Sequence, residues 1–265
     1  MNIVVAVNNA YVKPLKVMFS SLLTHNKECI HVFILQTERL LDSHICEIKS
    51  ILGNRGDIHL IDVPTIECNT RFSSASLSRI IAPFYLPLEI SRVLYLDADI
   101  LIRKPIKQLY DMDMSQKSIC AIPDYACDTE DGYHMQQLEL RRPKHYVNSG
   151  VLLVDLNRFR EKYNLQELLD GLKTHNAISS FIDQDFINDY FRDDIQYVDV
   201  TYNQPALWSA PKSAVIVHYI GEKKPWKTNY DLKFFFEYKK VWNRVNRNEK
   251  LSVFAYIKNI ARKLF

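Results

Sequence analysis

Asp97 and Asp99 stand one residue apart, directly after the apolar run VLYL at positions 93–96, which predicts a buried β-strand. The carboxyl end of a strand is where open α/β sheets bind their ligands. Two neighbouring carboxylates repel each other, but both can direct an oxygen at one hard divalent cation. Such an ion can hold a diphosphate and neutralise its charge as it leaves. The same spacing occurs in kinases, phosphatases, calcium loops and solvated strand ends, so other residues are needed to identify the role of these two aspartates.

His218, within the strand-like run VIVHY at positions 215–219, is a further candidate ligand. A single histidine in a strand is more often a packed residue. Beside two carboxylates, however, a neutral imidazole would complete a set of two oxygens and one nitrogen that suits manganese.

Four more polar residues lie near the ends of expected elements, and each has two interpretations. Arg79, on the helix before the Asp97 strand, is either solvated or a phosphate ligand. Asp124 is a third acid at a strand end. Asn148 either caps a polar turn or binds a sugar hydroxyl. Asp183 lies in the first turn of a helix, where the helix dipole favours a carboxylate without any catalytic role.

The elements that must position these residues alternate along the chain. Apolar patterns predict strands near residues 3–7, 30–35, 58–61, 92–96, 118–122, 151–154 and 215–219. They predict helices near 12–23 and 40–52, from a Ser73-Ser74 cap to about 84, and from 182. A polar loop is expected from 125 to 146. This alternation predicts an α/β fold with a mostly parallel sheet covered by helices.

Composition limits the class of protein. With 265 residues and 47% hydrophobic content, the chain can form one large domain or two small ones. Its five cysteines are odd in number, which favours a reducing compartment, and each is expected to be a small buried residue. The first residues enter a strand without a leader, and no run is long enough to span a membrane, so a cytoplasmic protein is expected.

Positive charge is concentrated at the C-terminus. Residues 222–265 hold 12 Lys and Arg against 4 Asp and Glu, although the whole chain has a net charge of only +3. Within 251–265 the apolar residues share one helical face, and three aromatic residues (234–236) and Trp242 precede them. This tail either packs on the domain or makes peripheral contact with an anionic membrane. No motif for nucleic-acid binding accompanies the charge.

Taken in order, six segments resemble the family 8 glycosyltransferases, retaining enzymes that include glycogenin and lipopolysaccharide galactosyl- and glucosyltransferases. They are residues 6–11, 78–79, 93–102, 148–152, 183–185 and 218–226. The resemblance implies one GT-A domain at 1–230, with a nucleotide half at about 1–100, an acceptor half at about 101–230 and a basic tail at 231–265. It also implies a UDP-sugar donor and a divalent metal, manganese or magnesium.

The resemblance further implies three groups of site residues. The implied metal ligands are Asp97, Asp99 and His218. The residues implied for the nucleotide and diphosphate are Val7, Asn8, Tyr11, Arg79, Asp97, Ala98, Asp99, Gly221 and Lys224, with Tyr11 stacked on uracil. The residues implied around the transferred sugar are Asn148, Asp183, Gln184 and Asp124. Asn8 replaces the family's usual Asp at the base, although its carbonyl can still accept from uracil N3–H.

The activity implied is metal-dependent, retaining transfer of galactose or glucose from a UDP-hexose to a saccharide or glycolipid acceptor, such as a lipopolysaccharide. A retaining glycosidase needs a carboxylate nucleophile. Gln184 occupies the corresponding position here, which favours front-face attack by the acceptor. Two alternatives remain at this stage. A haloacid-type phosphohydrolase would carry Gly-Thr after the acids, where this chain has Ile100-Leu101. A non-catalytic protein that binds sugar nucleotides would keep the site without turnover.

Overall fold

The molecule is organised around a seven-stranded sheet in the order β3-β2-β1-β4-β7-β6-β8. The structure, a computed structural model, describes residues 1–66, 74–124, 127–128, 143–176, 181–206, 212–222, 224–227 and 232–247. The strands are β1 (Asn2–Ala6), β2 (Ile30–Gln36), β3 (Gly56–Asp62), β4 (Arg92–Leu96), β6 (Ile119–Pro123), β7 (Val147–Asp155) and β8 (Ile195–Tyr197). Strands β3, β2, β1 and β4 are parallel, and only β7 runs opposite to its neighbours β4 and β6. The predicted mostly parallel sheet is confirmed.

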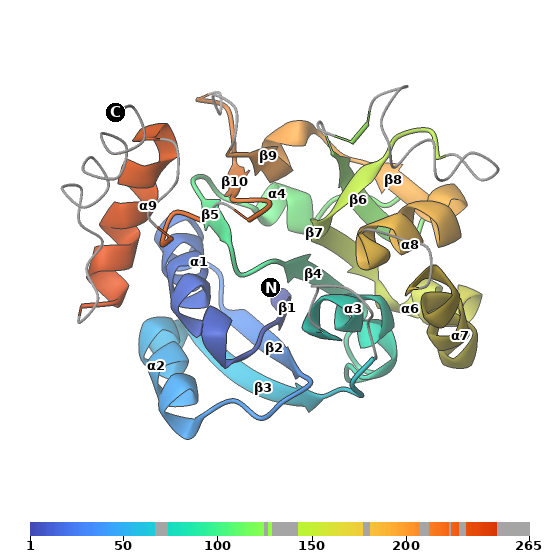
Figure 1. Ribbon diagram of the computed structural model, residues 1–265, viewed down its shortest axis with the longest axis horizontal. Coiled ribbons are helices and arrows are strands. Elements are labelled where there is room, and N and C mark those ends of the chain that lie inside the picture. The colour runs from blue at the N-terminus through green and yellow to red at the C-terminus, as the bar shows by residue number, and fades with distance from the viewer. Residues whose placement is uncertain are drawn as a thin grey trace, which may run out of the picture.

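Helices cover both faces of this sheet (Figure 1). The helices α1 (Val12–His25) and α2 (Asp42–Leu52) share a core with Ile3 and Val5 of β1. Val4 faces the other way, toward a second core formed with α3 (Ser74–Ile81), α6 (Leu156–Lys162), α7 (Leu165–Asn176) and α8 (Ile182–Tyr190). Successive side chains of a strand point to opposite faces, so the apolar run at the start of the chain places β1 between the two layers.

Short elements connect these layers. They are α4 (Lys107–Tyr110) and the 3₁₀ turns η1 (Asn9–Tyr11), η2 (Gly53–Arg55), η3 (Ala82–Phe84), η5 (Arg192–Asp194) and η6 (Val200–Asn203). The predicted core elements are present with ends shifted by a few residues, and residues 148–150, which were expected to form a turn, belong to β7. The helices α6 and α7 and the strand β8 were not predicted.

A second, three-stranded sheet stands beside the first, in the order β5-β10-β9. Its strands are β5 (Ile100–Ile102), β9 (Gln204–Pro205) and β10 (Ile216–His218), with β10 antiparallel to β5 and parallel to β9. Because β4 ends at Leu96 and β5 begins at Ile100, residues 97–99 are the link by which the chain passes from one sheet to the other.

The C-terminal helix α9 (Leu232–Val245) lies along α1 (Figure 1). Tyr238 and Trp242 are buried in a third core with Leu101 and Val217. Trp242 therefore packs on the domain, which is the first of the two interpretations of the tail. The side chains at 234 and 235 and the predicted amphipathic segment 251–265 lie outside the described residues. Among the described helices, none combines the length and apolar content needed to cross a membrane.

The cysteines differ from expectation in their burial. Cys29, Cys46, Cys120 and Cys127 are free thiols, and Cys68 lies outside the described residues. Cys120 is buried as expected, whereas Cys29 and Cys46 are exposed. Ser73 and most of the predicted loop 125–146 also lie outside the described part of the chain.

Candidate functional site

The two aspartates are held between the two sheets. The backbone N–H of Asp97 donates to the Gly150 carbonyl on β7 at 2.9 Å, and the Asp99 carbonyl accepts from the N–H of Tyr219, directly after β10, at 3.0 Å. Each carboxylate is thereby tied through its backbone to a different sheet. The Asp-x-Asp segment that follows the buried strand is thus held in place where the two sheets meet.

His218 joins the two carboxylates, as its sequence position suggested. Its Nε2 lies 3.2 Å from Asp99 Oδ1 and 3.7 Å from Asp97 Oδ2, and the candidate ligand atoms of all three residues lie within 4.8 Å of one another. His218 and Asp99 are buried. Two carboxylate oxygens and one imidazole nitrogen converging in this way fit a divalent cation such as manganese.

Lys224 is the cation closest to Asp99. Its Nζ contacts Asp99 Oδ2 and donates to the Tyr219 carbonyl at 2.6 Å. Burial alone would raise the pKa of Asp99, but Lys224, followed by His218, outweighs it, so the net pKa of Asp99 lies well below its ordinary value. Asp99 is therefore an ionised carboxylate in contact with a buried lysine.

Arg79 forms an ion pair with Asp97, as Lys224 does with Asp99. Its Nη2 lies 3.1 Å from Asp97 Oδ1, its Nε lies 3.4 Å from Asp183 Oδ2, and its Nη1 donates to the Ser149 carbonyl at 2.8 Å. The side chain is only 6% exposed, so the interpretation of Arg79 as a solvated helix residue is wrong. One guanidinium thus links the carboxylate at the end of β4 to the first turn of α8.

Three of the four residues predicted around a sugar are hydrogen-bonded to one another, and Ser149 connects the fourth, Asp183, to Gln184. Asn148 Nδ2 donates to Asp124 Oδ2 and to Gln184 Oε1, both at 3.0 Å, and Gln184 Nε2 donates to Asp124 Oδ2 at 3.1 Å. Ser149 Oγ donates to Asp183 Oδ2 at 2.9 Å. Both acids and Gln184 are buried, so Asp183 is not a solvated acid at a helix start.

Asp183 itself has an unusual environment. Burial raises its pKa, and the opposing charge of Arg79 and the hydrogen bond from Ser149 do not fully compensate. Asn188, one turn further along α8, accepts from the Val147 N–H at 2.7 Å and donates to the Val147 carbonyl at 2.8 Å. These bonds fix α8 to β7 and so hold Asp183 and Gln184 beside Asn148.

Asn203 connects two groups of side chains. The metal-type cluster consists of Asp97, Asp99 and His218, and the sugar-type cluster is the group around Asn148. Its Oδ1 lies 2.9 Å from His218 Nδ1, and its Nδ2 donates to Asn148 Oδ1 at 2.9 Å. An acceptor at Nδ1 fixes the proton there and leaves Nε2 free to face the carboxylates. Sequence reasoning missed Asn203, because nothing in its local pattern signals a contact with two distant strands.

Position 150 must be glycine because the side chains of His218 and Asp97 lie against its backbone and leave no room for a Cβ atom. A Cβ at this position would lie 2.3 Å from His218 Cε1 and 2.7 Å from Asp97 Oδ2. The pairing of β7 with β6 shifts register between Ala121 and Ile122, opposite residues 148–152 of β7. Such an irregularity turns a strand locally, which is common beside functional sites.

The residues predicted to hold a nucleotide base lie at the start of α1. Val7 is buried, and Asn8 Oδ1 accepts from the Ala10 N–H at 3.1 Å, capping η1. One lone pair of the Asn8 carbonyl is therefore already used, and one remains for a ligand. Tyr11 meets Trp226 edge to face, with ring centroids 6.1 Å apart.

The remaining predicted residues flank the cluster. Ala98 is buried between the two aspartates. Gly221 has φ +75°, a left-handed conformation that favours glycine, in the turn between β10 and Lys224. A further missed contact is Tyr95, whose hydroxyl donates to Asp97 Oδ1 at 2.8 Å. Strand alternation places Tyr95 and Asp97 on one face, which is the signal that could have found this pair.

Comparison with known proteins gives a consistent result. Residues 2–230 match the family described as Glycosyl transferase family 8. The chain is 29% identical over 248 residues to glycosyltransferase GlyF of Streptococcus pneumoniae serotype 4, covering 86% of this chain and 57% of that protein. It is 27% identical over 187 residues to lipopolysaccharide 1,3-galactosyltransferase of Salmonella typhimurium, covering 64% of this chain and 55% of that protein. This chain thus spans a little over half the length of these two relatives.

A solved structure shares the fold. The galactosyltransferase LgtC, crystallised with donor and acceptor sugar analogues, superposes with a TM-score of 0.78 at 21% identity, covering 92% of this chain and 96% of LgtC. The expected GT-A architecture, a mostly parallel sheet flanked by helices, is therefore confirmed.

Proposed function

This chain belongs to glycosyltransferase family 8, and we propose that it transfers galactose or glucose from a UDP-hexose to a saccharide acceptor with the help of a divalent metal ion. The observation that carries the proposal is the convergence of Asp97, Asp99 and His218 at the junction of the two sheets. Residues 1–230, of which 2–230 match the family, would form the transferase unit, with the nucleotide bound by the first half and the acceptor by the second.

The donor atoms suit manganese or magnesium. Asp97 and Asp99 supply hard oxygen ligands, and His218 supplies a nitrogen that favours manganese over magnesium. When bound, the ion supplies positive charge to the diphosphate of the donor. Asn203 would keep His218 in the tautomer that presents Nε2, through the contact at Nδ1.

Lys224 and Arg79 would bind the leaving diphosphate. Their charges are matched in the structure by Asp99 and Asp97. We expect Lys224 to exchange its contact with Asp99 for a phosphate oxygen when the donor binds. The lysine side chain is a flexible four-carbon stem, so its ammonium group can move while the backbone stays in place. A contact of this kind contributes on the order of 10²–10³ in rate when it acts on developing negative charge.

The group around Asn148 would hold the transferred sugar. Asn148, Asp183 and Asp124 offer amide and carboxylate groups to sugar hydroxyls, and each is already oriented by the hydrogen bonds described above. Gln184 is a poor nucleophile. The acceptor oxygen would therefore form its bond to the anomeric carbon on the face from which the phosphate oxygen departs, and the departing phosphate would take the acceptor's proton. Detection of a covalent glycosyl-Asp183 adduct by mass spectrometry would overturn this order of events.

Tyr11 and Asn8 would select the base. Tyr11 offers an aromatic ring for stacking on uracil, and Asn8 retains one carbonyl lone pair for uracil N3–H. The acceptor is proposed by analogy with relatives, since one is named a lipopolysaccharide galactosyltransferase and the LgtC structure holds an acceptor sugar analogue. A saccharide of a glycolipid is therefore the acceptor class we would test first.

The test is UDP release from a panel of UDP-hexoses, with manganese and with EDTA. We expect release from one hexose, stimulated by a saccharide acceptor, abolished by EDTA and lost in Asp97→Asn. The matched control is Asp193→Asn, because Asp193 is an exposed acid whose side chain contacts only Arg192 among the ion pairs described. Donor binding without release by any hexose and acceptor would favour the non-catalytic alternative. Release of phosphate from simple phosphoesters would favour a phosphohydrolase.

A further inference from the structure

A second cluster of metal-type ligands lies at the opposite end of the large sheet. His31 is the second residue of β2, and Asp57 and His59 are the second and fourth of the seven residues of β3. Both strands run parallel to β4, whose carboxyl end carries Asp97. The second cluster is therefore at the amino ends of the strands, away from the proposed sugar-nucleotide site.

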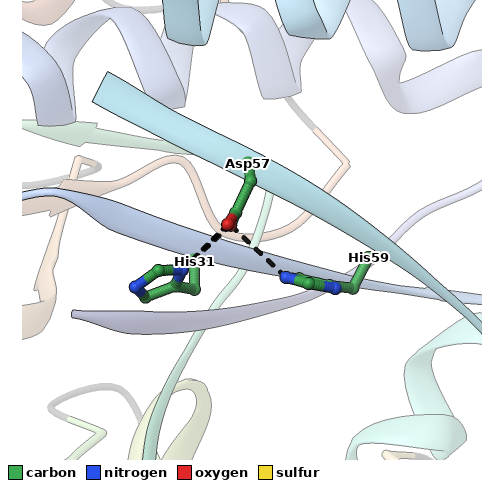
Figure 2. Close-up of side chains that lie close together, drawn as sticks. All are labelled: His31, Asp57 and His59. Atoms are coloured by element: carbon green, nitrogen blue, oxygen red, sulfur yellow. Dashed lines mark hydrogen bonds and ion pairs between the residues drawn. The ribbon is translucent and has the colours of Figure 1, made fainter. Parts of the chain in front are cut away.

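The three side chains converge on one carboxylate. His31 Nδ1 lies 3.0 Å from each oxygen of Asp57, and His59 Nε2 lies 3.4 Å from Asp57 Oδ1. Figure 2 shows the two imidazole rings approaching Asp57 from different sides. One ligand atom from each residue can be chosen such that all three lie within 4.8 Å of one another.

The strands impose this arrangement. In the parallel pairing of β2 with β3, His31 is the partner of Asp57 and Phe33 is the partner of His59. Residues two apart in a strand share a face, so all four side chains stand on the same side of the sheet. The His59 ring stacks on Phe33 with centroids 4.8 Å apart and an interplanar angle of 17°. That contact restrains the ring and keeps Nε2 toward Asp57.

The chemistry of this cluster differs from that of the buried one. Two imidazoles and one carboxylate suit zinc-class transition ions, which bind nitrogen ligands at about 2.0–2.1 Å. Tetrahedral coordination at that bond length separates neighbouring ligand atoms by about 3.3 Å. The observed separations of 3.0 and 3.4 Å are close to this value. The side chains are 49%, 54% and 46% exposed, which leaves water access to a further coordination position.

We propose that His31, Asp57 and His59 form a surface site for a zinc-class transition-metal ion, with water completing the coordination. Bound there, the ion would fasten β3, the edge strand of the sheet, to β2. Its affinity for zinc, copper and nickel would exceed its affinity for manganese, following the order expected for nitrogen-containing sites.

The experiment is a Co²⁺ and Zn²⁺ titration of the full chain after metal removal. It is done in the Asp99→Asn background, so that the buried cluster does not contribute. We expect one bound ion per chain, with the visible absorption of a low-coordinate Co²⁺ site displaced by Zn²⁺. Replacing both His31 and His59 with Gln should weaken Zn²⁺ binding at least about tenfold and abolish that absorption. The control is His25→Gln, because His25 is also exposed and lies outside the cluster.

A second measurement tests the same site without the Asp99→Asn substitution. In the otherwise natural chain, the same pair of substitutions should lower the number of tightly bound Co²⁺ ions by one and reduce the Zn²⁺-induced rise in melting temperature. Unchanged stoichiometry and affinity in the double variant would overturn the proposal. So would an equal loss in His25→Gln, which would indicate nonspecific histidine binding.

Discussion

Two clusters of histidine and aspartate differ in burial and in their charged neighbours: one lies where the two sheets meet, and the other is formed by the second residue of β2 and the second and fourth residues of β3. Asp97, Asp99 and His218 form the junction cluster, where Asp99 and His218 are buried and cations contact both acids. His31, Asp57 and His59 form the edge cluster, in which all three side chains are about half exposed. The comparison shows that similar ligand residues can have very different exposure and charged neighbours, so residue type alone does not determine the metal-binding properties expected of a cluster.

The electrostatic consequences follow from burial. Two unit charges 4 Å apart interact by about 4 kcal/mol at the effective dielectric constant of about 20 that describes protein sites, including buried ones, and by about 1 kcal/mol in bulk water. The junction cluster therefore needs Lys224 and Arg79 to balance its carboxylates, and these are the cations that we propose to bind the diphosphate. The side chains of the edge cluster are about half exposed, so solvent screens the charges within it. We thus expect metal binding at the junction cluster to depend on the nucleotide and at the edge cluster to be independent of it.

The largest effect is expected from Asp99→Asn. The change keeps the size of the side chain but removes the charge that contacts His218 and Lys224. Metal-dependent UDP release should fall on the order of 10²–10³-fold. Steady-state release measured beside Asp193→Asn checks this, and equal rates in the two variants would remove the junction cluster from catalysis.

A somewhat smaller effect is expected from Gly150→Ala. The added methyl group would collide with His218 and Asp97, and at least one of them must move. We expect manganese affinity in the presence of UDP to fall by about 100-fold. Gly171→Ala is the matched control, since its methyl group would meet the Phe186 ring at 2.9 Å, in the core around α7. That variant should change melting temperature while manganese affinity stays the same, and equal losses of affinity would contradict the specific role of Gly150.

Asn203→Ala should have a smaller effect again. It removes the acceptor at His218 Nδ1 and the donor to Asn148 without touching the carboxylates. Manganese affinity and kcat are expected to fall by about 10-fold. Asn203→Asp keeps an acceptor for His218 and should retain more manganese affinity than Ala. If Ala and Asp lower manganese affinity equally, Asn203 does not act through the histidine.

The smallest effect is expected at the edge cluster in the absence of metal. Asp57→Asn removes exposed contacts to His31 and His59, which are worth little in water. The free energy of unfolding in EDTA should change by less than about 0.5 kcal/mol. Urea unfolding measures this value. A loss of several kcal/mol would show that the edge cluster is a structural ion-pair network, unlike the solvated cluster described here.

Local sequence was sufficient for much of the fold and for the centre of the site. The apolar run at 93–96 fixes a buried strand, and the next-but-one spacing of Asp97 and Asp99 places both carboxylates at its end. The start of α1 at Val12 and of α8 at Ile182 was also predicted from apolar spacing. Such features depend on neighbours in the chain, so they can be read before any tertiary contact is known.

The missed features depend on contacts between distant segments. Asn203 lies on η6, yet it acts on β7 and β10. Burial of Arg79 and Asp183 was not predicted because each residue suits a solvated helix equally well until α3 and α8 are placed against β7. The edge cluster joins residues 26 positions apart in the sequence. Its signal is the repeated spacing His31-x-Phe33 and Asp57-x-His59, which becomes informative only when the register of β2 and β3 is known.

The most direct test of the account is Mn²⁺ binding to the full chain, followed by electron paramagnetic resonance with and without UDP. We predict that UDP strengthens binding of a single Mn²⁺, that Asp99→Asn abolishes this binding, and that the His31→Gln, His59→Gln double variant retains it. UDP-dependent Mn²⁺ binding that survives in Asp99→Asn would contradict the assignment of the metal to the junction cluster, and with it the proposed mechanism.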